Sequence, residues 1–171
     1  SRILNVVKTR KGTEFRTIQD VLFKTQSDLE KLSKNKGEIT GIQTGFYKLD
    51  KITSGFHANE LIILAARPGM GKTAFALNLA TNIALSGKTV ALFNMEMSGE
   101  QLVTRMLASV GQIEGGKLKN GNLHNEDWKR VNEAISRLAD TKMYIDDTSG
   151  MTISEIKAKC RRLASMKDGL D

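Results

Sequence analysis

Three short hydrophobic runs mark the strands that the sequence predicts. Residues 61–65 (LIILA), 88–94 (KTVALFN) and 143–147 (MYIDD) are apolar for most of their length, and a polar or glycine-bearing segment follows each of them. Runs of this length and composition are typical of buried strands in a parallel sheet. The sequence therefore predicts strands at these three places.

Between the runs, hydrophobic residues recur at spacings of three and four, which predicts helices. The predicted helices cover residues 18–33, 74–85, 98–110, 125–139 and 152–167. Three of them begin with a capping pair, namely Thr17 with Asp20, Ser98 with Gln101, and Thr152 with Glu155. Because strands and helices alternate, we expect an α/β fold whose mainly parallel sheet is covered on both faces.

The helix over 18–33 stands apart from the others. Its hydrophobic residues form one stripe, and Gly37 is the expected C-terminal cap. An amphipathic helix between two polar segments must bury its stripe, either by folding back on its own domain or by docking on a neighbouring subunit. The pattern leaves both open. We therefore divide the chain into a basic arm with this helix, 1–37, and a compact domain, 38–171.

The net charge of +7 is concentrated in the first of these parts. Residues 1–36 contain nine lysines and arginines against four acids, whereas residues 37–171 contain seventeen against fifteen. A nearly neutral domain is not expected to hold a nucleic-acid groove by itself. For the arm, a solvated surface is the simpler interpretation and contact with phosphate is the alternative.

Composition argues against a membrane-spanning, secreted or disulfide-bonded protein. No apolar run approaches the ~18 residues of a membrane-spanning helix, and no secretory signal opens the sequence. A single cysteine, Cys160, allows no internal disulfide and suits a cytoplasmic location. On the helix over 125–139, Trp128 shares a face with other hydrophobic residues, so we expect it in the core rather than as a platform for stacked bases.

The segment between the first run and the next helix carries the main chemical signal. Residues 66–73 read ARPGMGKT, which matches the phosphate-binding loop pattern GxxxxGK[ST] except that Ala66 replaces the first glycine. Glycines let backbone amides curl around an anion, and the helix that follows adds its unpaired donors. The candidate nucleotide-binding residues are Ala66, Arg67, Pro68, Gly69, Met70, Gly71, Lys72, Thr73 and Ala74.

This loop predicts ATP and Mg²⁺ as ligands. The Lys72 ammonium can reach the terminal phosphates, and the Thr73 hydroxyl is the expected Mg²⁺ ligand. Glu96 follows the strand over 88–94, at the sheet edge where α/β proteins place their chemistry. It could orient the attacking water, or it could simply favour the start of the next helix, and position alone does not decide between these roles.

A phosphate-loop enzyme also needs a second acid at a strand end to hold Mg²⁺. After the loop, only Asp146 and Asp147 end a predicted strand, and a complete helix follows that strand before the next one is due. We therefore do not assign the second acid to them. A further strand is expected after Asp171, so the chain is expected to be truncated.

Four stretches together resemble one family, the DnaB-type hexameric replicative DNA helicases of bacteria. They are ITGIQTGFYKLDKITSGF, LIILAARPGMGKTAFALNLA, NMEMSGEQLVTRML and IDDTSGMTISEIKAKCRRL, and the similarity runs from about residue 16 to residue 171. The resemblance implies a RecA-like phosphate-loop ATPase core, here its first portion, preceded by an amphipathic linker helix. It also implies a catalytic role for Glu96 together with Lys72, and an approach of Arg105 to the nucleotide.

The resemblance further implies partners and an activity. Residues 18–32 match the linker helix that packs on the adjacent identical subunit of a ring. Single-stranded DNA, primase and a helicase loader are expected partners, the DNA through parts beyond this sequence. The expected function is ATP-driven translocation and unwinding during DNA replication, with the 171 residues alone inactive. The alternative is a nucleotide-binding interaction module without turnover.

Overall fold

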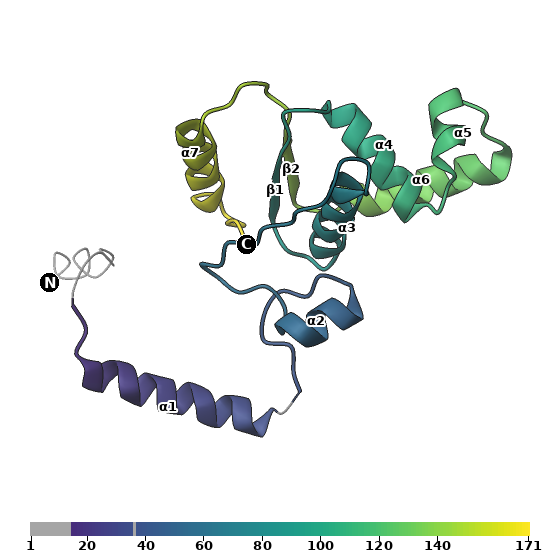
Figure 1. Ribbon diagram of the computed structural model, residues 1–171. Helices are drawn as coiled ribbons and strands as arrows, with labels where there is room; N and C mark the ends of the chain where they lie inside the picture. Colours follow the sequence, from purple (N-terminus) through teal and green to yellow (C-terminus); the bar gives the residue numbers. More distant parts are fainter. Residues whose placement is uncertain (1–14, 36) are drawn as a thin grey trace, which may run out of the picture. The chain divides into compact units, whose positions relative to one another are not determined.

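The chain divides into two compact units, Ser1–Glu38 and Ile39–Asp171. The computed structural model describes residues 15–35 and 37–171, so most of the basic arm predicted for residues 1–15 lies outside the described residues. The elements, shown in Figure 1, are α1 (Ile18–Lys34), α2 (Tyr47–Thr53), α3 (Lys72–Leu85), β1 (Val90–Phe93), α4 (Gly99–Val110), α5 (Gly115–Asn120), α6 (Asn125–Ala139), β2 (Met143–Asp146) and α7 (Ile153–Ala164).

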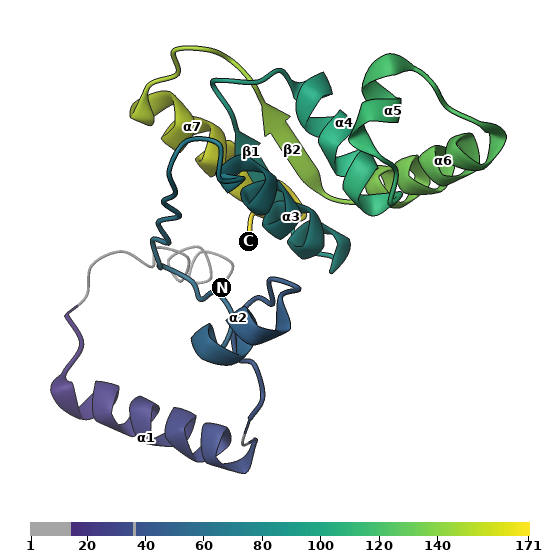
Figure 2. The ribbon, with the colours of Figure 1, turned by 45° about the vertical axis from the view of Figure 1, so that its right-hand side comes forward.

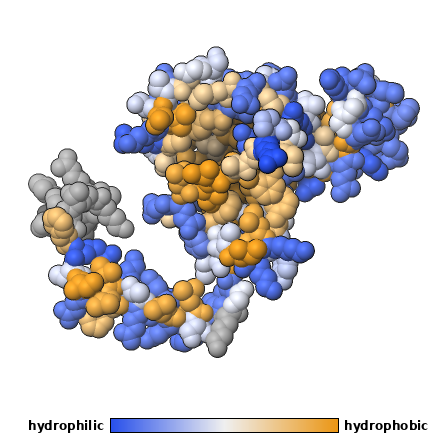
Figure 3. All heavy atoms as spheres, viewed as in Figure 1, coloured by the Kyte–Doolittle hydropathy of each residue, from blue (hydrophilic) through white to orange (hydrophobic). Residues whose placement is uncertain are grey.

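Helix α1 begins at the predicted cap. The Thr17 hydroxyl accepts from the Asp20 amide at 3.2 Å and donates to the Asp20 carboxylate at 2.6 Å. The helix ends at Lys34, and its C-terminal cap is Asn35 rather than the predicted Gly37, because the Asn35 amide closes the last turn on the Lys31 and Leu32 carbonyls. A lone helix cannot bury its own stripe, and no residue of α1 is buried. Figure 3 shows hydrophobic groups along its visible side.

Strands β1 and β2 pair in parallel, as predicted. The register joins Val90 to Met143 and Phe93 to Asp146. Side chains alternate between the two faces of a strand. Leu92 therefore turns toward the helices that Figures 1 and 2 show on one side of the sheet, α3 and α4, whereas Asp146 turns toward α7 on the other side.

The core lies on the α3–α4 side of the sheet. Leu77 of α3 packs with Leu102 and Met106 of α4, and side chains from both strands complete the cluster. On the opposite side, a cavity of about 350 Å³ separates α7 from the strands. The two faces are thus unequally filled, and the packed face is the one that supports the phosphate loop.

The first predicted strand is wrong as a secondary-structure prediction. Residues 61–65 belong to no strand, and Leu61 and Ile63 are 87% and 81% exposed. A strand exists only when its backbone pairs with another strand, and none of the described residues pairs with this run. Figure 3 shows hydrophobic groups on the face of the 39–171 unit that is turned to the viewer.

One other expectation is wrong, and two helices are additional to those predicted. Trp128 is 52% exposed rather than buried, because the residues of α6 that face the core are Val131 and Ala134, and Trp128 lies at the edge of their stripe. Helices α2 and α5 were not predicted, because they are only seven and six residues long and lie among glycines. Short helices leave little periodicity to recognise.

A buried carboxylate fastens the segment before the phosphate loop. Asp50 of α2 is 3% exposed and accepts from the amide and hydroxyl of Thr44, at 2.8 and 2.7 Å, and from the Gly45 amide at 3.2 Å. Asn82 of α3 donates to the Thr44 carbonyl at 3.0 Å. This network ties residues 44–50 to the helix that follows the loop.

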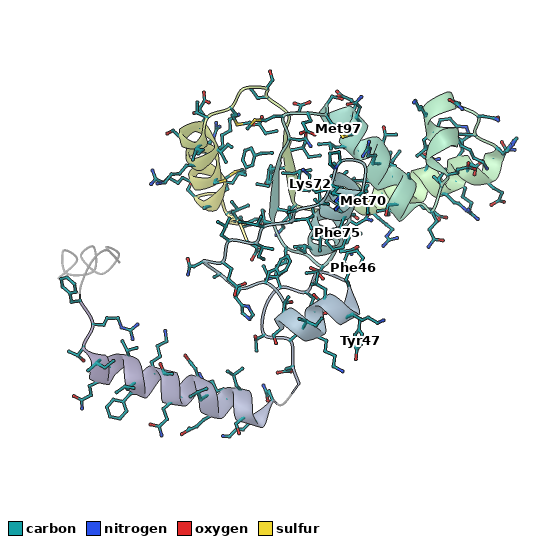
Figure 4. All side chains as sticks on the ribbon, viewed as in Figure 1. Phe46, Tyr47, Met70, Lys72, Phe75 and Met97 are labelled. Atoms are coloured by element: carbon teal, nitrogen blue, oxygen red, sulfur yellow. The ribbon has the colours of Figure 1, made fainter. Side chains whose placement is uncertain are left out.

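An aromatic pair makes a second connection to the same helix. The rings of Phe46 and Phe75 stack with centroids 5.0 Å apart, and Figure 4 shows the two side chains together near the start of α3. Stacked aromatic rings bury a large apolar area and add about 0.5–1.5 kcal/mol beyond it. The first turn of α3 is therefore supported from the side of residues 44–50.

Replacing Asp50 with Ala leaves three donors without their acceptor, two of them on the buried Thr44. We expect the free energy of unfolding to fall by about 2–4 kcal/mol, measured by urea titration. Asp28→Ala removes an exposed carboxylate from α1 and should change the free energy of unfolding by no more than about 0.5 kcal/mol. Equal stabilities of the two variants would contradict the role of the network.

Acid should weaken the contact between β2 and α7. The hydrogen bond from Lys159, and then those from Thr148, lower the pKa of Asp146 to about 2 from its ordinary 3.8. A lowered pKa stabilises the fold above the unfolded value and loses that stability as the pH falls toward 2. Asp146→Asn should therefore lose less stability than the wild type between pH 5 and pH 2.5, measured as the shift in urea midpoint. Equal shifts would show that the pair contributes nothing.

Candidate nucleotide-binding site

The predicted phosphate loop is a tight turn that leads directly into a helix. The Met70 amide donates to the Arg67 carbonyl at 3.2 Å. Gly69 and Gly71 have φ angles of +77° and +86°, a region that other residues rarely adopt. Gly71 is the N-terminal cap, so α3 begins at Lys72, two residues earlier than predicted. The helix therefore presents its unpaired amides to the loop.

The phosphate loop with the start of α3, and the segment from Glu96 to Arg105, meet around one pocket. It has a volume of about 530 Å³, within the range of ligand sites. The residues that line it are Ala66, Arg67, Pro68, Gly69, Gly71, Lys72, Thr73, Ala74, Glu96 and Arg105. Met70, the remaining candidate, is not among them and is 72% exposed. Figure 4 shows its position on the loop.

Glu96 reaches this pocket from the loop between β1 and α4. The chain leaves β1 at Phe93, and α4 begins at Gly99 after a capping box in which Ser98 and Gln101 exchange hydrogen bonds of 3.1 and 3.3 Å. The loop between them is short, so Glu96 stays close to the end of the strand. Arg105 enters the pocket from the middle of α4.

The charges around the pocket suit a polyphosphate. Lys72, Arg67 and Arg105 bring three cationic side chains, and the N-terminus of α3 adds the positive end of its dipole. Glu96 is the acidic residue among the described residues that line the pocket, and the Thr73 hydroxyl is an oxygen ligand of the type Mg²⁺ binds. The residues present thus fit a magnesium–nucleotide complex.

The two aspartates at the end of β2 make other contacts. Asp146 pairs with Lys159 and accepts from the Thr148 amide at 3.0 Å, whereas Asp147 accepts from the Gly99 amide at 2.7 Å. Neither lines the pocket. The contact between Asp147 and the start of α4 was not predicted, because it joins residues far apart in sequence.

No group of three or more histidine, cysteine, aspartate or glutamate residues in the described part of the chain could hold a metal ion. None of the helices in residues 15–35 and 37–171 is both long and apolar enough to cross a membrane.

Residues 41–171 match the family model of the DnaB-like helicase C terminal domain. The chain is 50% identical over 162 residues to the replicative DNA helicase DnaC of Bacillus subtilis (strain 168), which covers 94% of the chain and 36% of that relative. It is 47% identical to the replicative DNA helicase DnaB of Geobacillus stearothermophilus, with 95% and 36% covered. The chain thus spans about a third of the length of these relatives.

Solved structures show the same fold. One solved ATPase domain superposes with a TM-score of 0.80 at 31% identity, covering 87% of this chain and 52% of that one. A DnaB-like replicative helicase, solved in a study of its interactions with primase, superposes with a TM-score of 0.75 at 29% identity, covering 93% and 38%. The RecA-like ATPase fold is therefore confirmed, and the chain belongs to the family of the DnaB-like helicase C terminal domain.

Proposed function

We propose that this protein is a replicative DNA helicase that couples ATP hydrolysis at subunit interfaces to translocation on single-stranded DNA and to duplex unwinding. The observation that carries the proposal is the pocket itself. The glycine-bearing loop with the helix N-terminus that follows it, and the Glu96 carboxylate from the loop after β1, converge there. Such a convergence is what phosphoryl transfer to water requires.

The loop and α3 bind and orient the phosphates of ATP. Backbone amides between Arg67 and Thr73 surround the phosphate tail, and Lys72 balances charge on the terminal phosphates. Thr73 would hold Mg²⁺ through its hydroxyl, and the bound ion neutralises negative charge on the phosphates. The positive φ angles of Gly69 and Gly71 support this role, because they turn the backbone of the loop.

Glu96 acts on water. Glu96 lines the same pocket as the phosphate loop, so its carboxylate can orient the attacking water and accept its proton. Arg105 adds positive charge from α4. An arginine of the neighbouring subunit completes the site by stabilising charge in the transition state, as arginine fingers do.

The proposed assembly is a ring of identical subunits. The apolar stripe of α1, within residues 18–32, packs on the adjacent subunit. The primase interaction studied with one structural neighbour supports primase as a partner, and a helicase loader is the other proposed protein partner. The proposed location is the cytoplasm.

Hydrolysis is best tested in a full-length helicase in which residues 39–171 of this chain replace the corresponding segment of the Bacillus subtilis relative. We call it the chimaeric helicase. Lys72→Ala removes the charge facing the phosphates and should weaken binding of a fluorescent ATP analogue roughly tenfold to a hundredfold and abolish unwinding. Glu96→Gln should leave binding unchanged and slow ATP turnover by roughly 10²- to 10⁴-fold.

Two matched variants control for loss of charge elsewhere. Lys157→Ala removes an exposed lysine of α7, and Glu100→Gln neutralises an exposed acid in the first turn of α4. Both should bind and hydrolyse ATP at the rate of the unsubstituted chimaera. Unwinding retained by Lys72→Ala, or full turnover by Glu96→Gln, would refute the assigned roles.

A second candidate function is a nucleotide-binding module without turnover. It is favoured by the engagement of Asp146 and Asp147 outside the pocket, since Glu96 is then the acid left near the phosphates among the described residues. In this case the 171 residues bind ATP and expose α1 to a partner.

The module interpretation is tested by the turnover of the 171-residue chain. Because Glu96 is the acid that lines the pocket among the described residues, we expect this chain to bind Mg²⁺–ATP and release phosphate no faster than its Glu96→Gln variant. The measurement is phosphate release under excess ATP. Release that depends on Mg²⁺ and on Glu96 in the isolated chain would eliminate the module interpretation.

A further inference from the structure

The side chain of Asn94 forms hydrogen bonds with the backbone of the loop that carries Glu96. The Asn94 amide donates to the Asp146 carbonyl at 2.9 Å, which extends the pairing of the two strands by one residue. The Asn94 side-chain oxygen then accepts from the amides of Glu96 and Met97, both at 2.8 Å. The Asn94 side chain thus stabilises a turn of the backbone immediately after β1, and this turn fixes the backbone position of Glu96.

The next two amides are held as well. The Gln101 side chain accepts from the Ser98 amide at 3.1 Å, and the Asp147 carboxylate accepts from the Gly99 amide at 2.7 Å. Four consecutive amides, 96–99, therefore donate to side-chain oxygens. Asp147 comes from the end of β2, so the loop is fixed to both strands and to α4.

This arrangement matters because the Glu96 side chain itself is exposed. A flexible carboxylate can orient water only if its backbone attachment stays in place, and a shift of about 1 Å in a reacting group can cost 10²-fold in rate. Neither Asn94 nor Asp147 lines the pocket. Their contacts are instead with the backbone of the loop.

We propose that Asn94 and Asp147 are positioning residues for hydrolysis, which hold the backbone at residues 96–99 so that the Glu96 carboxylate faces the phosphate loop. The proposal rests on the proposed role of Glu96. It separates two kinds of contribution: Lys72 and the loop amides bind the nucleotide, whereas Asn94 and Asp147 affect turnover alone.

The test uses Asn94→Ala and Asp147→Ala in the chimaeric helicase. Each should lower kcat for ATP hydrolysis by roughly 10- to 100-fold and leave KM and binding of the fluorescent analogue within about threefold of the unsubstituted protein. Asn94→Asp and Asp147→Asn keep an oxygen acceptor at the same place and should recover most of the lost rate. A role in folding alone would lower the melting temperature and would not split kcat from KM.

A double variant shows whether Asn94 acts through Glu96. In a Glu96→Gln background the carboxylate is already gone, so adding Asn94→Ala should slow turnover by less than about twofold further. In the 171-residue chain, Asn94→Ala should speed hydrogen exchange at the Glu96 and Met97 amides, because it removes their acceptor.

Asp146→Ala is the matched control. It removes the neighbouring carboxylate at the same strand end, which bonds Lys159 of α7 and the Thr148 amide but accepts from none of the amides 96–99. It should leave kcat unchanged. An equal loss of kcat in Asp146→Ala would mean that any damage to the end of β2 slows turnover, and would overturn the proposal.

The other outcomes separate this proposal from the function it rests on. Full turnover by Asn94→Ala and Asp147→Ala, with Glu96→Gln inactive, refutes the positioning role and leaves the proposed function standing. A further large loss in the double variant also refutes it, because Asn94 then acts independently of Glu96. Full turnover by Glu96→Gln refutes both, since no carboxylate would remain to be positioned.

Discussion

The parallel pairing of β1 with β2 is the constraint on which the site depends. Because both strands run in the same direction, the segments that follow them leave the sheet at the same edge. The Glu96 loop and Asp147 meet there. A shift of the register by one residue would turn Leu92 out of the core and carry Asp147 away from α4. Packing of the hydrophobic core and geometry of the site therefore specify the same register.

The elements that could be predicted are those whose signal is local. Two strands, the capped starts of α1, α4 and α7, and the glycine turn into α3 all follow from residues within a few positions of one another. The strand predicted over 61–65 is absent because strand pairing is not local. The composition of the run suits a strand, but a strand also needs a neighbouring strand to pair with. The prediction that Trp128 is buried was wrong, because periodicity indicates a hydrophobic stripe without showing where the edges of that stripe lie.

The site divides in the same way. The phosphate-loop residues form a contiguous motif, and Glu96 could be placed because it follows a strand in an α/β fold. Arg105 came from family resemblance alone, since nothing about a mid-helix arginine indicates which side of the helix a ligand will occupy. The supporting contacts of Asn94 and Asp147 could not be predicted, because one depends on a turn and the other on a pairing across 48 residues.

The exposed run before the phosphate loop has a consequence for how the protein behaves in solution. Uncharged hydrophobic segments of six or seven residues with unpaired backbone are templates for aggregation between copies. Residues 61–66 form such a segment, and a charge closes it at each end, Glu60 before it and Arg67 after it. Flanking charges of this kind act as gatekeepers. Arg67 thus serves colloidal stability as well as the pocket, so neutralising it would endanger solubility even where nucleotide binding survived.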